Sequence, residues 1–367
     1  MLMRHLCLLF VVTLLAACEP VAAGRYRVDT VAAGLDHPWS MAFLPDGRML
    51  VTERAGRLRI IEDGQLLEAP VRGVPEAFVR GQAGLFGVVL DPDYEDNGWI
   101  YLSLAHGTGR ANSTRVVRGR LADGEFRDLE VLFTAEPPRG TSIHYGGRMA
   151  FLADGTLVIA LGDGGDFRED AQRLDSHTGT IVRIDRDGSI PPDNPFVGRD
   201  DARPEIYSYG HRNVQGLVFD QRSGRLWAHE HGPRGGDEIN LVLPGRNYGW
   251  PVATFGVDYS GAQITPYTSR PGMEDPRLHW TPSIAPSGMA LYRGEQFPDW
   301  NGDLLVTALV AREVRRVMLD GERITGQEAL LGEIGERLRS IETGPDGALY
   351  VLTDSTRGRV LRITPAE

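Results

Sequence analysis

The feature that most constrains this chain is a pattern that recurs six times along its length. Each copy joins an apolar segment to a turn rich in Pro, Asp or Gly, and then to an inner strand. The copies are Met41–Gly47 before Met49–Val51, Val88–Asp93 before Trp99–Tyr101, Met149–Gly155 before Leu157–Ile159, Leu217–Asp220 before Leu226–Ala228, Met289–Tyr292 before Asp303–Val306, and Ile341–Gly347 before Leu349–Val351. Repetition of one small unit indicates an array of similar sheets.

The apolar segments fit such sheets, since they are short, often β-branched, and flanked by Gly, Asp or Pro. A four-stranded antiparallel sheet cannot bury both faces alone, whereas sheets packed radially cover one another and leave only short edges. The sequence therefore predicts an all-β fold, a six-bladed β-propeller of four-stranded antiparallel blades. Tyr26–Ala32 reads as one more strand, placed to complete the last blade. The alternative is another sheet protein with Asp-Gly hairpins.

The first residues resemble an export leader. Arg4 and His5 precede an uncharged apolar run that is too short to span a bilayer and ends at Cys18. Cleavage either precedes Cys18, whose thiol is then acylated as in a bacterial lipobox, or follows Ala23. We expect residues 1–23 to be a signal peptide or lipoprotein leader with a short tether, and residues 24–367 to form one propeller domain. The protein is expected to be exported to the periplasm and, if acylated, anchored in the outer membrane.

Cysteine content and charge limit the other expectations. Cys7 and Cys18 are the only two cysteines, so the propeller contains no internal disulfide. Lys and Arg number 39 against 50 Asp and Glu, which gives a net charge of −11 with the two signs interspersed. A nucleic-acid surface normally needs a concentrated basic face, so we expect no nucleic-acid partner. Membrane contact is expected only through a lipid on Cys18.

Two loops carry residues suited to proton transfer and to anion binding. His144 lies in a glycine-flanked loop, and a neutral imidazole can take a proton from an alcohol as hydride leaves. Arg212 and Asn213 follow a permissive glycine, and together they can hold a developing oxyanion or a quinone oxygen. The structural alternatives are an exposed loop histidine, and an arginine paired with a carboxylate beside a turn asparagine.

A further stretch, residues 229–251, is rich in hard oxygen ligands. Its carboxylates, and the carbonyls around Gly232 and Pro233, suit calcium, although a solvated acidic loop is the alternative. His229 and His231 alternate and point opposite ways, which disfavours a zinc pair. Residues 161–166 are interpreted as a tight Gly-rich turn rather than a metal loop. Arg337 and Arg339 face an anionic ligand or form a solvated strand edge.

Taken together, these segments resemble the soluble pyrroloquinoline quinone (PQQ)-dependent sugar dehydrogenases, in particular the bacterial aldose sugar dehydrogenase branch. The resemblance runs from Leu35–Gly47 to Gly344–Asp354. Its most specific pieces are Gly81–Gly84, Gly210–Gly216, Glu230–Asn240 and Asn247–Pro251. It implies oxidation of the C1 hydroxyl of an aldose to a lactone by hydride transfer to calcium-bound PQQ.

The resemblance also assigns roles to individual residues. It makes His144 the general base and Arg212 the group that stabilises the reacting oxygens. Gln82 and Asn213 would contact the cofactor or substrate, and Arg337 and Arg339 the cofactor carboxylates. The carbonyls of Gly232 and Pro233 would hold a calcium ion against the quinone. Glu238 and the backbone of Tyr248 would hold a second, structural calcium.

The sequence departs from the family at two places. Val310 stands where relatives have a lysine that pairs with the anionic cofactor, and Arg312 is the nearest substitute. Thr281 stands where relatives have an aromatic wall, with Trp280 one position away. Two alternatives therefore stay open beside the dehydrogenase: a non-catalytic binding propeller with a decayed cofactor site, and a calcium-dependent hydrolase of the lactonase type. The expected partners are an aldose and an external electron acceptor, for a monomer or a homodimer.

Overall fold

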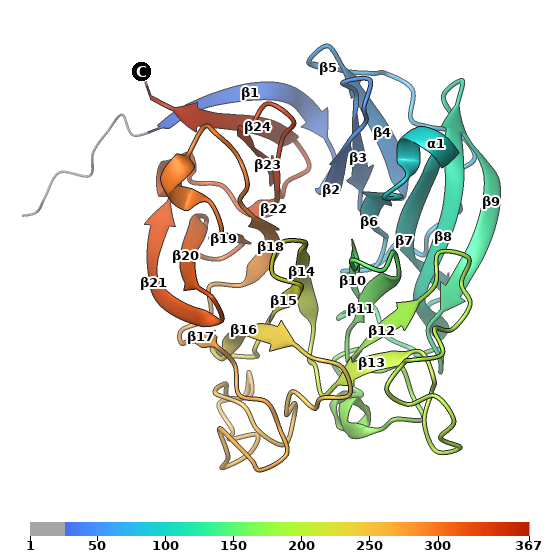
Figure 1. Cartoon of the computed structure of the whole chain (residues 1–367), viewed down its shortest axis with the longest axis vertical. Helices are drawn as coiled ribbons and strands as arrows, with labels where there is room; N and C mark the ends of the chain where they lie inside the picture. The colour runs from blue at the N-terminus through green and yellow to red at the C-terminus, as the bar shows by residue number, and fades with distance from the viewer. Residues whose placement is uncertain (1–25, 367) are drawn as a thin grey trace, which may run out of the picture.

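A computed structural model describes residues 26–366; the predicted leader, with Cys7 and Cys18, lies outside them. These residues form six four-stranded antiparallel sheets that follow one another around a ring (Figure 1). The six-bladed propeller predicted from the repeats is therefore confirmed. Among the described residues, no helix has the length and apolar character needed to cross a membrane.

Each sheet starts with a strand near the axis of the ring, and successive strands lie further out. The inner strands are β2 (Pro38–Phe43), β6 (Leu85–Leu90), β10 (Gly146–Phe151), β14 (Val214–Asp220), β18 (Pro286–Leu291) and β22 (Leu338–Thr343). The second strands are β3 (Met49–Glu53), β7 (Trp99–Thr108), β11 (Leu157–Leu161), β15 (Arg225–Glu230), β19 (Leu304–Ala308) and β23 (Leu349–Thr353).

The outer half of each sheet is built in the same order. The third strands are β4 (Arg57–Glu62), β8 (Ala111–Ala122), β12 (Thr180–Ile184), β16 (Asp237–Val242), β20 (Val314–Asp320) and β24 (Gly358–Pro365). The outermost strands are β5 (Gln65–Leu66), β9 (Glu125–Thr134), β13 (Ile206–Tyr209), β17 (Leu278–Trp280), β21 (Arg323–Leu330) and β1 (Tyr26–Leu35). Only short helical turns interrupt the strands: α1 (Tyr94–Asn97), η1 (Arg168–Gln172), η2 (Pro298–Trp300) and η3 (Gly332–Ile334).

The structure orders the two strands of each repeat. The strand after the turn, such as Met49–Val51, is the second strand of its blade, and the apolar segment before the turn is the strand nearest the axis. Both strands of each hairpin are buried on both faces. Their hydrophobic pattern therefore does not distinguish the position nearer the axis.

The last blade is closed by the first strand of the propeller, as predicted. β1 pairs antiparallel with β24, from Tyr26 opposite Pro365 to Leu35 opposite Gly358. Figure 1 shows these two strands side by side next to the C-terminus. This pairing gives the final sheet its fourth strand from the opposite end of the chain.

The core is divided among the interfaces between blades. Each of the six largest groups of buried apolar side chains lies between two neighbouring sheets. Within β3, Leu50 packs against the second blade, whereas Met49 and Val51 pack against the last. This alternation is why the strand is apolar at successive positions. Complete burial of each such side chain stabilises the fold by about 1.5–3 kcal/mol.

Every inner strand carries a register shift at its first residues. The shifts lie at Pro38/Ser40, Leu85/Val88, Gly146/Met149, Val214/Gly216, Pro286/Gly288 and Leu338/Ser340. A bulge redirects the side chain within it. The same irregularity in all six blades therefore presents one set of side chains at a common end of the ring.

Candidate active site

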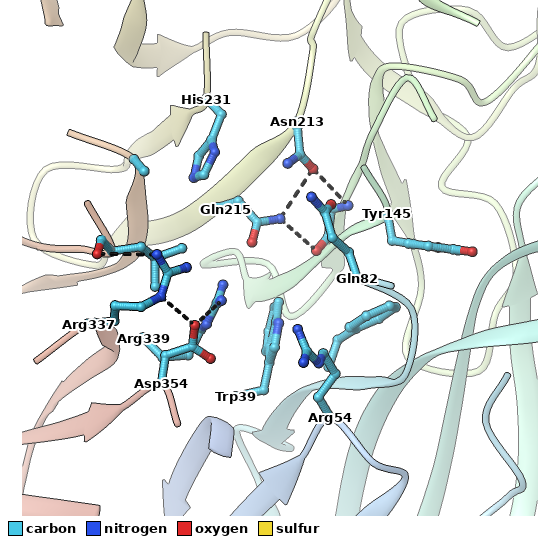
Figure 2. A pocket seen from close by; sticks show the side chains of 14 residues that line it. Trp39, Arg54, Gln82, Tyr145, Asn213, Gln215, His231, Arg337, Arg339 and Asp354 are labelled. Atoms are coloured by element: carbon cyan, nitrogen blue, oxygen red, sulfur yellow. Dashed lines mark hydrogen bonds and ion pairs between the residues drawn. The ribbon is translucent and has the colours of Figure 1, made fainter. Parts of the chain in front are cut away.

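The bulged ends of the inner strands surround a cavity of about 220 Å³ on the axis of the ring. Figure 2 shows Arg337, Arg339 and Asp354 on one side of this main cavity, and Gln82 and Asn213 on the other. Its lining residues come from loops and strand ends of all six blades: Trp39, Arg54, Gln82, Phe86, Tyr145, Gly146, Asn213, Gln215, His231, Ala285, Leu309, Arg337, Arg339 and Asp354. The four residues predicted to bind a cofactor are all in this set.

The amide groups of the wall are held by neighbouring loops. Gln82 Oε1 accepts a hydrogen bond from the His144 backbone N–H at 2.8 Å, which joins the first interblade loop to the histidine loop. Asn213 Oδ1 accepts from Gln215 Nε2 at 3.2 Å and from the Gly146 N–H at 3.4 Å. These contacts fix two side chains that face the cavity.

The opposite wall is rich in arginine. Arg339 Nη2 lies 3.0 Å from Asp354 Oδ2, and Arg337 Nε lies 3.3 Å from the same oxygen. Burial alone would raise the pKa of Asp354, but the charges and hydrogen bonds of the two arginines lower it below its ordinary value. Arg54 also lines the cavity, and Arg339 Nε is buried without a hydrogen-bond partner among residues 26–366. One carboxylate therefore faces three guanidinium groups, a charge balance that suits an anionic ligand.

His144 is not among the residues that line the main cavity, but its backbone N–H is hydrogen-bonded to Gln82, which lines it, and its ring is held in a fixed orientation. Its backbone has a φ of 53°, in the left-handed region, and its side chain is 10% exposed. Nδ1 lies 2.6 Å from Asp163 Oδ1, and Nε2 makes no hydrogen bond with another described residue. Because a carboxylate only accepts, Nδ1 carries the hydrogen, and Nε2 is left with a lone pair. This is the arrangement that a general base needs.

Sequence reasoning assigned no role to Asp163, the partner of His144. It lies at 0% exposure and also accepts from the Gly165 N–H and from Trp250 Nε1, both at 2.8 Å. Burial alone would raise the pKa of Asp163, but the His144 hydrogen bond and the Arg212 charge lower it below its ordinary value. The predicted Gly-rich turn is present, with Gly164 and Gly165 at positive φ. It serves to place this carboxylate.

Arg212 connects the histidine to the oxygen-rich loop. Its Nη1 donates to the carbonyls of Gly232 and His231, at 2.9 and 3.0 Å, and its guanidinium lies 5.3 Å from the Trp250 ring. Trp250 in turn donates to the carboxylate that holds His144. His144, Arg212 and Gly232 therefore lie at the same end of the ring.

Next to Arg212 is a second cavity of about 10 Å³, the size of one water molecule or ion. It is lined by Glu230, Glu238, Gly232 and Tyr248, so it brings together three of the four predicted metal residues. Burial and the charge of Glu230 hold the pKa of Glu238 well above its ordinary value. Two carboxylates share this small space, but residues 26–366 contain no group of three His, Cys, Asp or Glu side chains arranged around a metal position.

The fourth predicted metal residue, Pro233, lines a wider outer cavity of about 790 Å³ with Gly232. Val310 and Thr281 also line it, and Val310 is 62% exposed. Arg312 donates to the Gly335 carbonyl and lines neither the main nor the outer cavity, so it does not replace the lysine. Trp280 is buried in the core and donates to Gln327, so it forms no wall.

His231 lines all three cavities. Burial and the charge of Arg212 hold the pKa of His231 well below its ordinary value, so the ring is neutral. Its Nε2 donates to the Pro286 carbonyl at 2.5 Å, which leaves Nδ1 as an acceptor.

Several lining residues escaped sequence reasoning: Arg54, Gln215, His231 and Asp354. Gln215 stands inside the bulge of an inner strand. The other three come directly after second strands, at the same end of three different blades. The repeats thus held a usable signal, because the residue that follows the second strand lines the main cavity in four blades, Leu309 being the fourth.

Comparison with known proteins agrees with this architecture. The chain is 43% identical to the aldose sugar dehydrogenase YliI of Escherichia coli over 350 residues, which cover 94% of each chain. The crystal structure of the Escherichia coli enzyme without cofactor superposes with a TM-score of 0.89, covering 93% of this chain and 99% of the other.

Two more distant relatives have names that include a quinone. The PQQ-bound structure of an aldose sugar dehydrogenase from Streptomyces coelicolor is 30% identical, with a TM-score of 0.75, and covers 93% of this chain and 99% of its own. Quinoprotein glucose dehydrogenase B of Acinetobacter calcoaceticus is 27% identical over 422 residues, covering 92% of this chain and 87% of its own. A family model described as "Glucose / Sorbosone dehydrogenase" matches residues 35–362. The chain belongs to the glucose/sorbosone dehydrogenase family.

Proposed function

We propose that this chain is a PQQ- and Ca²⁺-dependent aldose dehydrogenase that oxidises the C1 hydroxyl of its sugar to a lactone. The observation that carries the proposal is the His144–Asp163 pair. The pair leaves Nε2 of the neutral His144 ring as an acceptor, and the His144 backbone is hydrogen-bonded to Gln82 in the wall of a cavity that three arginines line. A base next to a cationic cavity suits hydride transfer from an alcohol to an anionic acceptor.

The charges and aromatic rings of the main cavity suit PQQ. PQQ is a planar aromatic tricarboxylate, and the cavity combines Arg54, Arg337 and Arg339 with the rings of Trp39 and Phe86. Arg339 Nε, which has no partner in the part of the chain that the structure describes, is a donor suited to a carboxylate. These residues would hold the cofactor, with Gln82, Asn213 and Gln215 as polar contacts.

The small cavity beside Arg212 fits a calcium ion by the chemistry of its donors. Glu230 and Glu238 place two carboxylates at a cavity of about 10 Å³, and burial together with the charge of Glu230 raises the pKa of Glu238, an effect that a bound cation would oppose. Carboxylate and backbone carbonyl oxygens are the ligands calcium prefers. We assign Glu238 and Tyr248 to this ion, and the Gly232 and Pro233 carbonyls to one against the quinone.

The chain's own residues then account for the proton. His144 Nε2 accepts the proton of the C1 hydroxyl as hydrogen leaves C1 with its electron pair, and the C1–O bond becomes the lactone carbonyl. Asp163 stabilises the imidazolium that forms, and Arg212 stabilises negative charge on the reacting oxygen. When bound, PQQ supplies the hydride acceptor and Ca²⁺ a Lewis acid that polarises it.

Reconstitution tests the proposal. Purified protein given PQQ and Ca²⁺ should reduce a dye in the presence of aldoses, and His144→Ala should abolish this activity with the fold intact. His279→Ala is the control, because that histidine is exposed and lines none of the three cavities. Absence of dye reduction across a broad panel of aldoses would refute the dehydrogenase.

The same preparation distinguishes the dehydrogenase from the alternative that Val310 favours, a non-catalytic binding propeller. A non-catalytic propeller predicts no PQQ binding by titration calorimetry, because the cofactor would lack its lysine partner.

We further propose that the protein is exported and carries a lipid on Cys18, and that reduced cofactor passes its electrons to an external acceptor.

A further inference from the structure

Arg148 lies behind the wall of the main cavity, where the inner strands of five blades meet. It belongs to β10, and its guanidinium donates to the carbonyls of Gln215 at 2.8 Å, Ser287 at 2.7 Å and Arg339 at 3.2 Å. Those carbonyls belong to β14, β18 and β22. The guanidinium also lies 4.0 Å from the centre of the Trp39 ring on β2. Three of these neighbours, Trp39, Gln215 and Arg339, line the cavity itself.

This buried cation has no ion-pair partner among the described residues. Every oxygen that its guanidinium contacts within hydrogen-bond distance is neutral: three carbonyls and the Ser340 hydroxyl. By contrast, the buried Arg183 of the same blade pairs with Asp154 at 2.7 Å and Asp193 at 2.8 Å. A buried charge is normally paired, so the isolated charge of Arg148 favours an anionic ligand in the neighbouring cavity.

Glu342 on β22 is the carboxyl group that interacts with Arg148 across a longer distance. Burial raises the pKa of Glu342 to about 7, so the carboxyl is only partly ionised near neutral pH. Burial lowers the pKa of Arg148 to about 9, so its guanidinium still carries its charge near neutral pH. The positive charge behind the cavity is therefore incompletely balanced by the protein.

We propose that Arg148 is a positioning residue whose unpaired charge stabilises an aromatic polycarboxylate in the main cavity. It acts through the wall formed by Trp39 and Gln215 and adds to the charges of the arginines that face the cavity. The inference rests on the proposed function for the identity of PQQ, but it makes a separate claim. The cavity prefers anions, and Arg148 contributes to that preference without touching them.

The experiment measures binding to the full-length protein by titration calorimetry, with PQQ and with benzene-1,3,5-tricarboxylate as a simpler probe. Arg148→Gln removes the charge at similar length, and Arg148→Lys keeps it. Loss of one nearby charge in Arg148→Gln should lower the affinity for both ligands by about tenfold and reduce the dependence of that affinity on salt concentration. Arg148→Lys should stay within about threefold of wild type. Arg183→Gln, a buried arginine already paired within the protein, is the matched control and should leave binding unchanged.

Glu342→Gln gives a complementary variant that does not depend on the stability of Arg148→Gln. Removing the opposing carboxylate should raise the affinity for both ligands by about threefold at pH 8, where Glu342 is mostly ionised. Circular dichroism and the melting temperature establish that each variant is folded.

The outcomes separate the two claims. Binding of the tricarboxylate without PQQ refutes the proposed function and leaves Arg148 to be judged on that probe. If neither ligand binds, the inference is overturned. An equal loss of affinity in Arg148→Lys and Arg148→Gln also overturns it, because that is the result expected if Arg148 matters only for packing. Unchanged affinity in Glu342→Gln also contradicts it.

Discussion

Replacing Asp163 by Asn tests the proposed proton transfer most directly. The carboxylate accepts hydrogen bonds from His144, Gly165 and Trp250, at 2.6, 2.8 and 2.8 Å. An amide offers one acceptor oxygen, so in either orientation its NH₂ group faces a buried N–H. The unpaired donor costs about 1–3 kcal/mol of stability. Loss of the negative charge beside the developing imidazolium should lower kcat by about 10²–10⁴-fold.

The assay is steady-state dye reduction by PQQ-loaded enzyme, with PQQ affinity measured in parallel. Because Asp163 does not line the main cavity, the affinity for PQQ should stay near the wild-type value while kcat falls. Asp166→Asn is the control, since that carboxylate is exposed three residues further along the same turn. A folded Asp163→Asn enzyme with kcat within about threefold of wild type would refute the base assignment.

Three further predictions concern the metal, the packing and the lipid. The pKa of Glu238 is higher in the folded protein than in the unfolded chain. Its contribution to stability is therefore present at pH values below the pKa in the unfolded chain, and is lost as the pH rises through the pKa in the folded protein. Stabilisation by Ca²⁺ should therefore grow from pH 5 to pH 8, reaching about 2.7 kcal/mol at a hundredfold excess over Kd. Equal melting temperatures in Ca²⁺ and in EDTA at pH 8 would exclude the site. A Cβ at Gly216 would lie 2.2 Å from Nε2 of His229, so Gly216→Ala should destabilise the fold by about 1–3 kcal/mol in chemical denaturation. Gly332→Ala meets no atom within 4 Å and should be neutral, and similar losses in both would contradict the packing argument. Finally, Cys18→Ala should abolish incorporation of labelled palmitate, and unchanged labelling would place the lipid elsewhere.

The fold was predictable because its signals are local. A turn and the short apolar strands on either side of it lie close together in the sequence. This unit recurs once per blade, so the number of blades follows from the sequence. The position of each strand within its blade does not. Met41 and Val51 belong to adjacent strands and pack in the same interface between blades, so hydrophobicity alone ranks neither as nearer the axis.

The site was only partly predictable, since its chemistry depends on contacts between distant loops. His144 and Arg212 stand out by residue type in their loops, whereas Asp163 looked like part of a turn. What gives Asp163 its role is the 2.6 Å contact with His144, a distance that no spacing along the chain specifies. Trp280 illustrates the reverse case: an aromatic residue one position from a predicted wall points into the core instead.

The pairing of β1 with β24 makes the two ends of the propeller depend on each other. Joining segments separated by roughly 320 residues carries a loop-closure cost of about 5 kcal/mol, which only the completed ring offsets. Until Gly358–Pro365 is available, Tyr26–Leu35 has no neighbour to pair with, and the other blades stand as an open arc with apolar faces at both ends. A nascent chain must keep these faces from other proteins until its last blade is assembled.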